Sequence, residues 1–193
     1  ILVQTDDLER FEEIFGLPPS IENFNKLSQE DQKYCEYLME IGHRITFLPQ
    51  DAQEGFGHAV YCARDWVGSD PFLLLLGDHL YHSSTPRSCA QQLIDTYRKV
   101  GTSVVGVQAT PGKAVRRFGT VTGVFEKDPE QAGQPLLSIT EFFEKPTREY
   151  AAEHLHVDGM EPDTFLTVFC QYVLKPQIFD YLEENIRNNV RER

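Results

Sequence analysis

The sequence predicts an α/β protein in which helices cover both faces of a mixed, mostly parallel β-sheet. Strand-like and helix-like segments alternate along residues 1–107 in the order β-α-α-β-α-β-α-β. Residues 72–76 form a continuous apolar run, which is typical of a strand covered on both faces. The 193 residues are enough for one domain with a core of its own.

Each element of residues 1–107 has a local signal. Residues 1–5 are typical of a strand, and the helix expected after Asp7 carries one apolar face and ends at Gly16. Ser28 has the chemistry of a helix N-cap, and Gly42 is expected to end that second helix. The remaining elements are predicted, in chain order, as a strand at 44–48, a helix at 55–67, a strand at 72–76, a helix at 85–100 and a strand at 102–107.

The pattern changes in the second half of the chain. Strands at 119–125 and 137–143 flank a polar loop at 127–134, which predicts an antiparallel pair. A short helix at 147–154, a long strand at 165–173 and a helix opening at Pro176 complete the series. No long linker interrupts residues 1–193, so we expect a single domain, incomplete at both ends because the chain starts on a strand and stops on a charged helix.

Composition restricts the partners. With 18 Lys and Arg against 30 Asp and Glu, the net charge is −12, which argues against a nucleic-acid partner but allows a small anionic ligand. The longest apolar run is too short to span a bilayer, so no membrane partner is expected. Four widely spaced cysteines without a C-x-x-C pair favour free thiols and a cytoplasmic location. The sequence leaves open whether copies form a homo-oligomer.

The first candidate site is the turn that starts at Gln50 and enters a helix through Gly55, Gly57 and His58. Two glycines let a ligand approach the backbone closely, and a helix start presents free amides. The Gln50 side chain, at the end of a strand, could pair with both a donor and an acceptor on a nucleotide base. A plain strand-to-helix turn remains the alternative, because a lone G-x-G is a weak signal.

The second candidate is Asp78, which directly follows the buried strand at 72–76. One carboxylate at the end of a strand is enough for Mg²⁺ when substrate phosphates supply other ligands. The alternative is an Asp that only shapes a turn. His79 and His82 lie nearby, but two such histidines are weak support for a zinc site.

The third candidate is the pair Glu144 and Lys145 at the end of the second strand of the antiparallel pair. Strand alternation places Phe142 and Glu144 on one face and Glu141 and Phe143 on the other. A fixed lysine can neutralise phosphate as a point charge, and a carboxylate can accept hydrogen bonds from sugar hydroxyls. The alternative is an ordinary surface ion pair.

Together these segments resemble the bacterial-type UTP–glucose-1-phosphate uridylyltransferases, also called UDP-glucose pyrophosphorylases, over nearly the whole chain. The resemblance implies a Rossmann-like nucleotide-diphospho-sugar transferase fold, the substrates UTP and glucose 1-phosphate, the products UDP-glucose and pyrophosphate, and Mg²⁺ as cofactor. The matching segments follow the family's order: Gln50, 55–60, 72–78, 117–121, 144–146 and 171–174.

The resemblance also implies roles for individual residues. Gln50 and the backbone at Gly55 would hold uracil, in a substrate-binding turn that continues through Gly57 and His58. Asp78 would bind Mg²⁺ near the α-phosphate of UTP.

On the sugar side, Gly119 would pack against the sugar phosphate and Glu144 would hold sugar hydroxyls. Lys145 would contact the phosphates and would act with Asp78 as the catalytic pair.

The sequence departs from the family pattern in three ways. The family's Gly-rich triphosphate loop and its second Mg²⁺-binding Asp have no counterpart in residues 1–193, and Phe165 and Cys170 stand where the family has Asn and Gly. We therefore expect these 193 residues, made alone, to be inactive or very weak. Three alternatives stay open: a metal-dependent glycosyltransferase, a non-catalytic domain that binds a nucleotide-sugar, and a nucleotidyltransferase for another base or sugar.

Overall fold

The computed structural model describes residues 1–126 and 135–190, which form two compact units. Unit 1 comprises Ile1–Asp70 and Pro176–Arg193, and unit 2 comprises Pro71–Lys175. The expectation that residues 1–193 form one domain therefore stays a prediction. The polar loop expected at 127–134 lies outside the described residues, as do residues 191–193.

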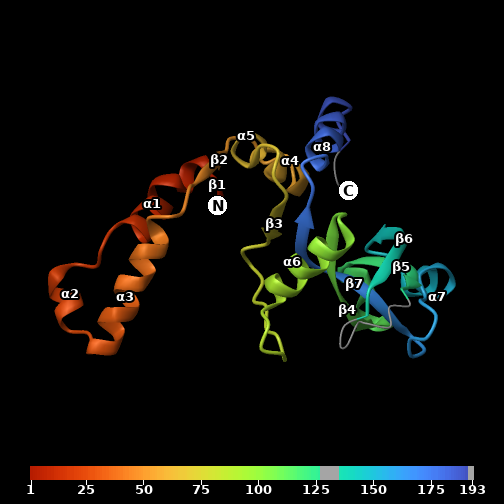
Figure 1. Ribbon diagram of the computed structural model, residues 1–193. Coiled ribbons are helices and arrows are strands. Elements are labelled where there is room, and N and C mark those ends of the chain that lie inside the picture. The colour runs from red at the N-terminus through yellow and green to blue at the C-terminus, as the bar shows by residue number, and fades with distance from the viewer. Residues whose placement is uncertain (127–134, 191–193) are drawn as a thin grey trace. The chain divides into compact units, whose positions relative to one another are not determined.

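Unit 1 combines a two-stranded parallel sheet with helices (Figure 1). Leu2 of β1 lies opposite Leu48 of β2. The unit's elements are β1 (Leu2–Gln4), the 3₁₀ helix η1 (Thr5–Asp7), α1 (Leu8–Gly16), α2 (Ile21–Asn25), α3 (Gln29–Gly42), β2 (Leu48–Gln50), α4 (Phe56–Tyr61), α5 (Arg64–Val67) and α8 (Ile178–Arg187).

Helix α1 approaches α3 closely at one glycine and packs on Phe47 through aromatic side chains. Ser28 caps α3 as predicted, because its hydroxyl accepts a hydrogen bond from the Asp31 amide. Gly42 belongs to the helix rather than following it, and a Cβ there would collide with the Phe15 carbonyl. The rings of Phe11, Phe15 and Phe47 then meet at centroid distances of 5.8–6.3 Å.

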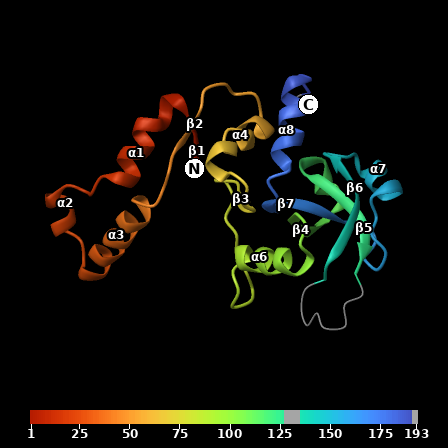
Figure 2. The same cartoon turned by 45° about the horizontal axis from the view of Figure 1, so that its top comes forward.

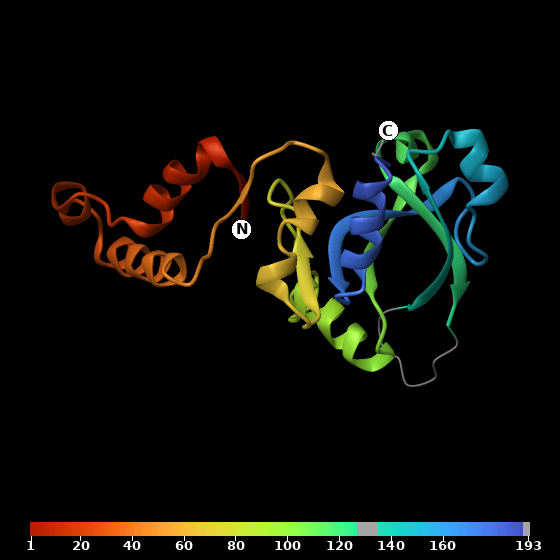
Figure 3. The ribbon, with the colours of Figure 1, turned by 90° about the horizontal axis from the view of Figure 1, so that it is seen from above.

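Unit 2 is a five-stranded antiparallel sheet with β7 at its centre. Strand β4 pairs with one edge of β7, while β3 and β5 pair with successive parts of the other edge. Figures 2 and 3 show β5 and β6 curving side by side next to β7. The unit's elements are β3 (Phe72–Leu75), α6 (Cys89–Val100), β4 (Val104–Pro111), the 3₁₀ helix η2 (Gly112–Arg117), β5 (Gly119–Phe125), β6 (Leu137–Glu144), α7 (Arg148–His154) and β7 (Thr164–Leu174).

The prediction of a mostly parallel sheet is wrong. Among the described strands only β1 and β2 pair in parallel. The alternating pattern was right for β3 and β4, which run in the same direction and are joined through α6. Both are antiparallel to β7. However, β7, which comes much later in the chain, lies between them, and no local pattern indicates such an insertion.

The core of unit 2 lies on both faces of β7. The face that carries Phe165 packs against η2 and α7 through Val115, Ala151 and Leu155, all fully buried. The opposite face carries Leu166 and packs with Val121, Val157 and Val168, and a hollow on that face is also lined by α6. Helices therefore cover both faces of this sheet, as predicted.

Several boundaries differ from the prediction. Residues 44–47 form no strand, because the amides of Arg44 and Ile45 bond back to the end of α3 and the strand starts only where Leu48 meets β1. The helix predicted at 55–67 is two helices, α4 and α5, and α6 begins at Cys89 after the N-cap Ser88. Across the described residues, no helix is both long and apolar enough to cross a membrane.

Candidate functional site

The predicted site residues fall into two groups, one in each unit. Unit 1 contains the predicted base-binding turn, with Gln50, Gly55, Gly57 and His58. Unit 2 contains the predicted metal, phosphate and sugar residues, which are Asp78, Gly119, Glu144 and Lys145. That both groups belong to one substrate site stays a prediction.

In unit 1, the Gln50 side chain is held by His58. Nε2 of Gln50 donates a hydrogen bond to Nδ1 of His58 at 3.1 Å. The neutral imidazole therefore carries its proton on Nε2, which faces Sγ of Cys62 at 3.9 Å. Burial raises the pKa of the Cys62 thiol, and the nearby charge of Asp51 raises it further, so this cysteine is a neutral packing partner. The arrangement orients the Gln50 amide at the end of β2.

The two glycines of the turn have different structural roles. Gly55 has φ 98° and immediately precedes α4, and no atom lies within 4 Å of the position a Cβ would take. A Cβ on Gly57 would lie 3.1 Å from Leu182, so this glycine lets α4 pack closely on α8. A small hollow of about 80 Å³ lies here, lined by the turn and α8. Gly55 thus leaves its backbone open to approach, whereas helix packing explains Gly57.

In unit 2, Asp78 follows β3 and presents a charged carboxylate. Its side chain is 81% exposed, and Nδ1 of His79 donates a hydrogen bond to Oδ1 at 2.7 Å. That hydrogen bond, followed by one from its own backbone amide, lowers the pKa of Asp78 below its ordinary value. The carboxylate is therefore ionised at neutral pH and open to a ligand.

The end of β6 positions Glu144 and Lys145. Phe142 and Glu144 share a face as predicted, since a Cβ on Gly119 would meet both side chains. Phe143 lies on the other face, where its ring is 4.3 Å from that of Tyr150. Gly119 lies opposite Glu144 in the β5–β6 pair. A side chain at position 119 would collide with Phe142 and Glu144, so this position requires glycine.

The backbone of Lys145 has an unusual conformation. It has φ 48°, a conformation that side chains other than glycine rarely adopt, and its amide bonds to the Phe118 carbonyl at 3.2 Å. The next residue, Pro146, is fully buried and anchors the turn. Nζ of Lys145 contacts Oε1 of Glu144 at 3.1 Å while both side chains stay about half exposed. Strained backbone of this kind is often retained at functional sites.

Asp78 and Glu144 both act electrostatically on one residue of β7. Burial raises the pKa of the Cys170 thiol, and the negative charges of Asp78 and Glu144 raise it further, so both carboxylates lie within electrostatic range of this thiol. Tyr81 donates a hydrogen bond from its hydroxyl to the Cys170 carbonyl at 2.8 Å. The structure thus brings Asp78, Glu144 and Lys145 to the same stretch of the unit 2 sheet.

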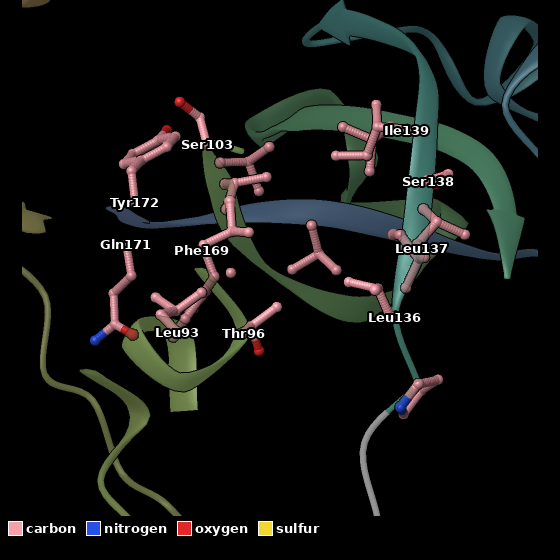
Figure 4. Close-up of a pocket in the computed structure, with 18 of the residues that line it drawn as sticks. Leu93, Thr96, Ser103, Leu136, Leu137, Ser138, Ile139, Phe169, Gln171 and Tyr172 are labelled. Atoms are coloured by element: carbon pink, nitrogen blue, oxygen red, sulfur yellow. The ribbon is translucent and has the colours of Figure 1, made fainter. Parts of the chain in front are cut away.

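The described residues show no metal centre with several protein ligands, and the larger hollow of unit 2 is mostly apolar. Within residues 1–126 and 135–190, no three or more His, Cys, Asp or Glu side chains form a group that could hold a metal ion. The hollow of about 1040 Å³ in unit 2 is lined mostly by apolar side chains of α6, β4, β5, β6 and β7, among them Leu93, Leu137 and Ile139 (Figure 4). None of the predicted site residues lines this hollow.

Sequence reasoning missed the aromatic residues around Asp78. The rings of His79, Tyr81 and Phe169 form a cluster with centroid distances of 5.8–6.1 Å. The sequence singled out His79 only as a weak metal-ligand candidate. Tyr81 and Phe169 carry no signal that could have connected them, because they meet only when β7 inserts beside β3.

The geometry can be compared with known proteins. The family model for nucleotidyl transferases matches residues 21–193. This chain belongs to the nucleotidyl transferase family. The UTP–glucose-1-phosphate uridylyltransferase of Staphylococcus epidermidis is 36% identical over 159 residues, and that of Staphylococcus saprophyticus is 37% identical over 139 residues. These alignments cover 82% and 72% of this chain but 48% and 42% of the relatives, so the chain spans about half the length of the curated relatives it matches.

Solved structures confirm the fold of this family member. The apo form of a UDP-glucose pyrophosphorylase matches with a TM-score of 0.70 at 23% identity, over 95% of this chain and 60% of that chain. A UTP-bound enzyme from Acinetobacter baumannii matches with a TM-score of 0.59 at 25% identity, over 89% of this chain and 63% of that chain. The predicted α/β nucleotidyltransferase fold and the resemblance to this family are therefore confirmed.

Proposed function

We propose that this chain supplies the nucleotide-binding and sugar-phosphate-binding elements of a UTP–glucose-1-phosphate uridylyltransferase. The observation that carries the proposal is that Asp78 and Glu144, with Lys145 paired to Glu144, lie within electrostatic range of one residue of β7, Cys170. The 36% identity to the S. epidermidis uridylyltransferase supports the choice of substrates. A cytoplasmic location remains a prediction from the sequence.

The reaction needs positioning and charge neutralisation more than covalent help. A phosphate oxygen of glucose 1-phosphate attacks the α-phosphorus of UTP, and the bond from that phosphorus to the bridging oxygen of pyrophosphate breaks. Because the attacking oxygen is already anionic, no general base is required. Lys145, fixed by its turn, would neutralise charge on the phosphates, and Glu144 would accept hydrogen bonds from sugar hydroxyls.

The chemistry of Asp78 fits a divalent cation, and we propose Mg²⁺. Its carboxylate is ionised and exposed, and Asp78 lies three residues after the end of β3. Mg²⁺ commonly takes one or two protein carboxylates and completes its shell with waters and substrate phosphates, so a single Asp is adequate. When bound, the cation would supply positive charge beside the α-phosphate.

Unit 1 would supply the base contacts. The Gln50 side chain has two N–H donors and one carbonyl acceptor. The hydrogen bond to His58 uses one donor, so the side-chain amide has one further N–H and the carbonyl oxygen with which to bind a base. Uracil presents a complementary acceptor and donor on its pairing edge. The open backbone at Gly55 would allow the base to lie close to the turn.

Isothermal titration calorimetry of the 193-residue chain with UTP, dTTP and GTP, each with and without Mg²⁺, tests this proposal. We expect UTP to bind most tightly, and Mg²⁺ to strengthen its binding. Gln50→Ala should weaken UTP binding up to about tenfold, since one or two neutral hydrogen bonds are lost. Asp78→Asn should remove the effect of Mg²⁺.

A matched control and a turnover assay sharpen the result. His82→Asn changes an exposed side chain in the same loop as Asp78 and should leave UTP binding unchanged. Equal binding of all three nucleotides, or a Mg²⁺ effect that survives Asp78→Asn, would contradict the proposal. Release of pyrophosphate from UTP and glucose 1-phosphate distinguishes an enzyme from a domain that only binds nucleotide-sugars; robust turnover by the chain alone would overturn the expectation that it is inactive.

A further inference from the structure

The side chain of Asp78 is highly exposed, yet one of its oxygens has a fixed partner. His79 Nδ1 lies 2.7 Å from Oδ1 of Asp78. Because an ionised carboxylate can only accept, Nδ1 must carry the hydrogen and donate it. The carboxylate remains 81% exposed and therefore open to a ligand.

The imidazole that donates this hydrogen bond is itself held by two aromatic rings. It stacks on Tyr81 at a centroid distance of 6.1 Å and an interplanar angle of 18°. Phe169 meets it edge-on at 5.9 Å and 85°, and Phe169 also meets Tyr81 edge-on at 5.8 Å. As a result, the His79 side chain is only 28% exposed, against 81% for Asp78.

The two rings are in turn fixed to β7. Phe169 belongs to β7, and the hydroxyl of Tyr81 donates to the carbonyl of Cys170, the next residue. Cys170 has φ 52°, where the register of β4 against β7 shifts, so the bulge turns this carbonyl toward Tyr81. A chain of contacts thus runs from the centre of the sheet through Tyr81 and His79 to the carboxylate.

We propose that His79 is a positioning residue, whose imidazole, packed against both Tyr81 and Phe169, donates Nδ1–H to Asp78 and fixes the orientation in which its carboxylate receives a divalent cation. This inference rests on the proposed function, in which Asp78 is the cation ligand. An exposed Asp after a strand would otherwise sample several rotamers, and ordering it would cost free energy when the cation binds. Hydrogen bonds to ligating carboxylates commonly tune metal sites in this way.

The test measures Mn²⁺ binding rather than turnover. Mn²⁺ alone is titrated into the chain, and paramagnetic broadening of the backbone amide NMR signals of residues 77–80 reports the dissociation constant. His79→Phe keeps a ring packed against Tyr81 and Phe169 but loses the donor, and should weaken Mn²⁺ binding about tenfold. His79→Asn places an amide N–H near the position of Nδ1 and should stay within about threefold of wild type. His82→Asn, in the same loop, should match wild type.

A double variant separates positioning from a general structural effect. Asp78→Asn should abolish the local broadening, and His79→Phe should add nothing in the Asp78→Asn background. If Asp78→Asn leaves Mn²⁺ binding intact, the cation assignment in the proposed function fails and this inference fails with it. If Asp78→Asn abolishes binding but His79→Phe binds like wild type, only the role of His79 is overturned.

One measurement needs no variant. Nitrogen-15 chemical shifts of the His79 ring in the wild-type protein, recorded at a pH at which this imidazole is neutral, identify which ring nitrogen carries the hydrogen. The hydrogen bond to Asp78 requires Nδ1–H. Observation of the Nε2–H form would overturn the proposal even if a variant failed to fold.

Discussion

At the residue scale, the region around the candidate site is marked by two non-glycine residues in the left-handed conformation. Lys145 has φ 48° and Cys170 has φ 52°. Each such residue costs about 1–2 kcal/mol unless its surroundings require it. Here they turn the chain at the end of β6 and within the bulge of β7, and the charges of Asp78 and Glu144 both act on Cys170 in that bulge.

The strain at Cys170 predicts an unusual order of stabilities. Cys170→Gly and Cys170→Ala both remove the thiol, but only glycine relieves the backbone. We expect the glycine variant to be more stable than the alanine variant by about 1 kcal/mol, whereas at ordinary φ the order is reversed. Urea unfolding of the two variants measures the difference.

Val124, which is 67% exposed in β5, provides the control pair. Val124→Ala should be more stable than Val124→Gly, since an extended backbone gives glycine no advantage. If Ala also proves the more stable residue at position 170, the strain argument is wrong.

Because of the ion pair between Arg148 and Asp163, we expect part of the free energy of unfolding to depend on pH. Nε and Nη2 of Arg148 donate to the two oxygens of Asp163, both at 2.8 Å, and this bonding lowers the pKa of Asp163 from its ordinary 3.8. A depressed folded-state pKa means stability that is present above the ordinary pKa and is lost as pH falls through the folded value. Wild type should therefore be more stable than Asp163→Asn at pH 7, and the difference should shrink below about pH 4.

Asparagine suits this comparison because it also tolerates the left-handed backbone of Asp163, φ 56°. Urea unfolding at a series of pH values measures the difference between the two proteins. High salt should reduce it, since the pair is partly exposed. A difference that stays constant from pH 7 to pH 2 would show that Arg148 does not favour the charged carboxylate.

At the element scale, the pairing of β5 with β6 depends on one glycine at a bulge. The register shifts between Thr122 and Gly123, so that Thr122 pairs with Glu141 but Gly123 pairs with Ile139. A Cβ on Gly123 would collide with the carbonyl of Ser138 and lie 3.0 Å from Cα of Ile139. Backbone atoms cannot move aside as a side chain can, so the bulge requires glycine.

Gly123→Ala should therefore destabilise the chain by about 1–3 kcal/mol, measured as a lower urea midpoint. Gly106→Ala in β4 is the matched control, because its Cβ would make only ordinary contacts of 3.6–3.8 Å. Equal stability of the two variants would mean that the ladder tolerates a side chain at the bulge.

At the scale of the whole molecule, the fully buried side chains are distributed unequally between the two units. Those of unit 2 form two clusters around β7, whereas α1, α2 and α3 of unit 1 leave many apolar side chains exposed, among them Ile14, Ile21 and Tyr34. Local stability follows the burial of apolar contacts. The helices of α1 to α3 should therefore be the less stable part of the chain.

Native-state hydrogen exchange followed by NMR measures this directly. Amides of α1 and α3 should exchange at least about tenfold faster than those of β4 and β7, which corresponds to 1.4 kcal/mol or more in opening free energy. Protection in α1 and α3 equal to that of β7 would show that the aromatic contacts of Phe11, Phe15 and Phe47 stabilise this region more than its exposure suggests.

The sequence alone was enough for the features that depend on near neighbours. Hydrophobic period, caps and turns identified most elements in order. They also placed Asp78 and Lys145 after strands and Phe142 and Glu144 on one face, because each of these features follows from residues close together in the chain. The motifs also indicated the family before any comparison.

Only the tertiary structure decided that β7 inserts between β3 and β4. This insertion makes the sheet of unit 2 antiparallel. The same insertion joins Tyr81 to Cys170 across 89 residues and brings Phe169 against His79. Such contacts depend on which distant strands pair, and the free energy of that choice is spread over the whole core, so no local pattern along the chain encodes it.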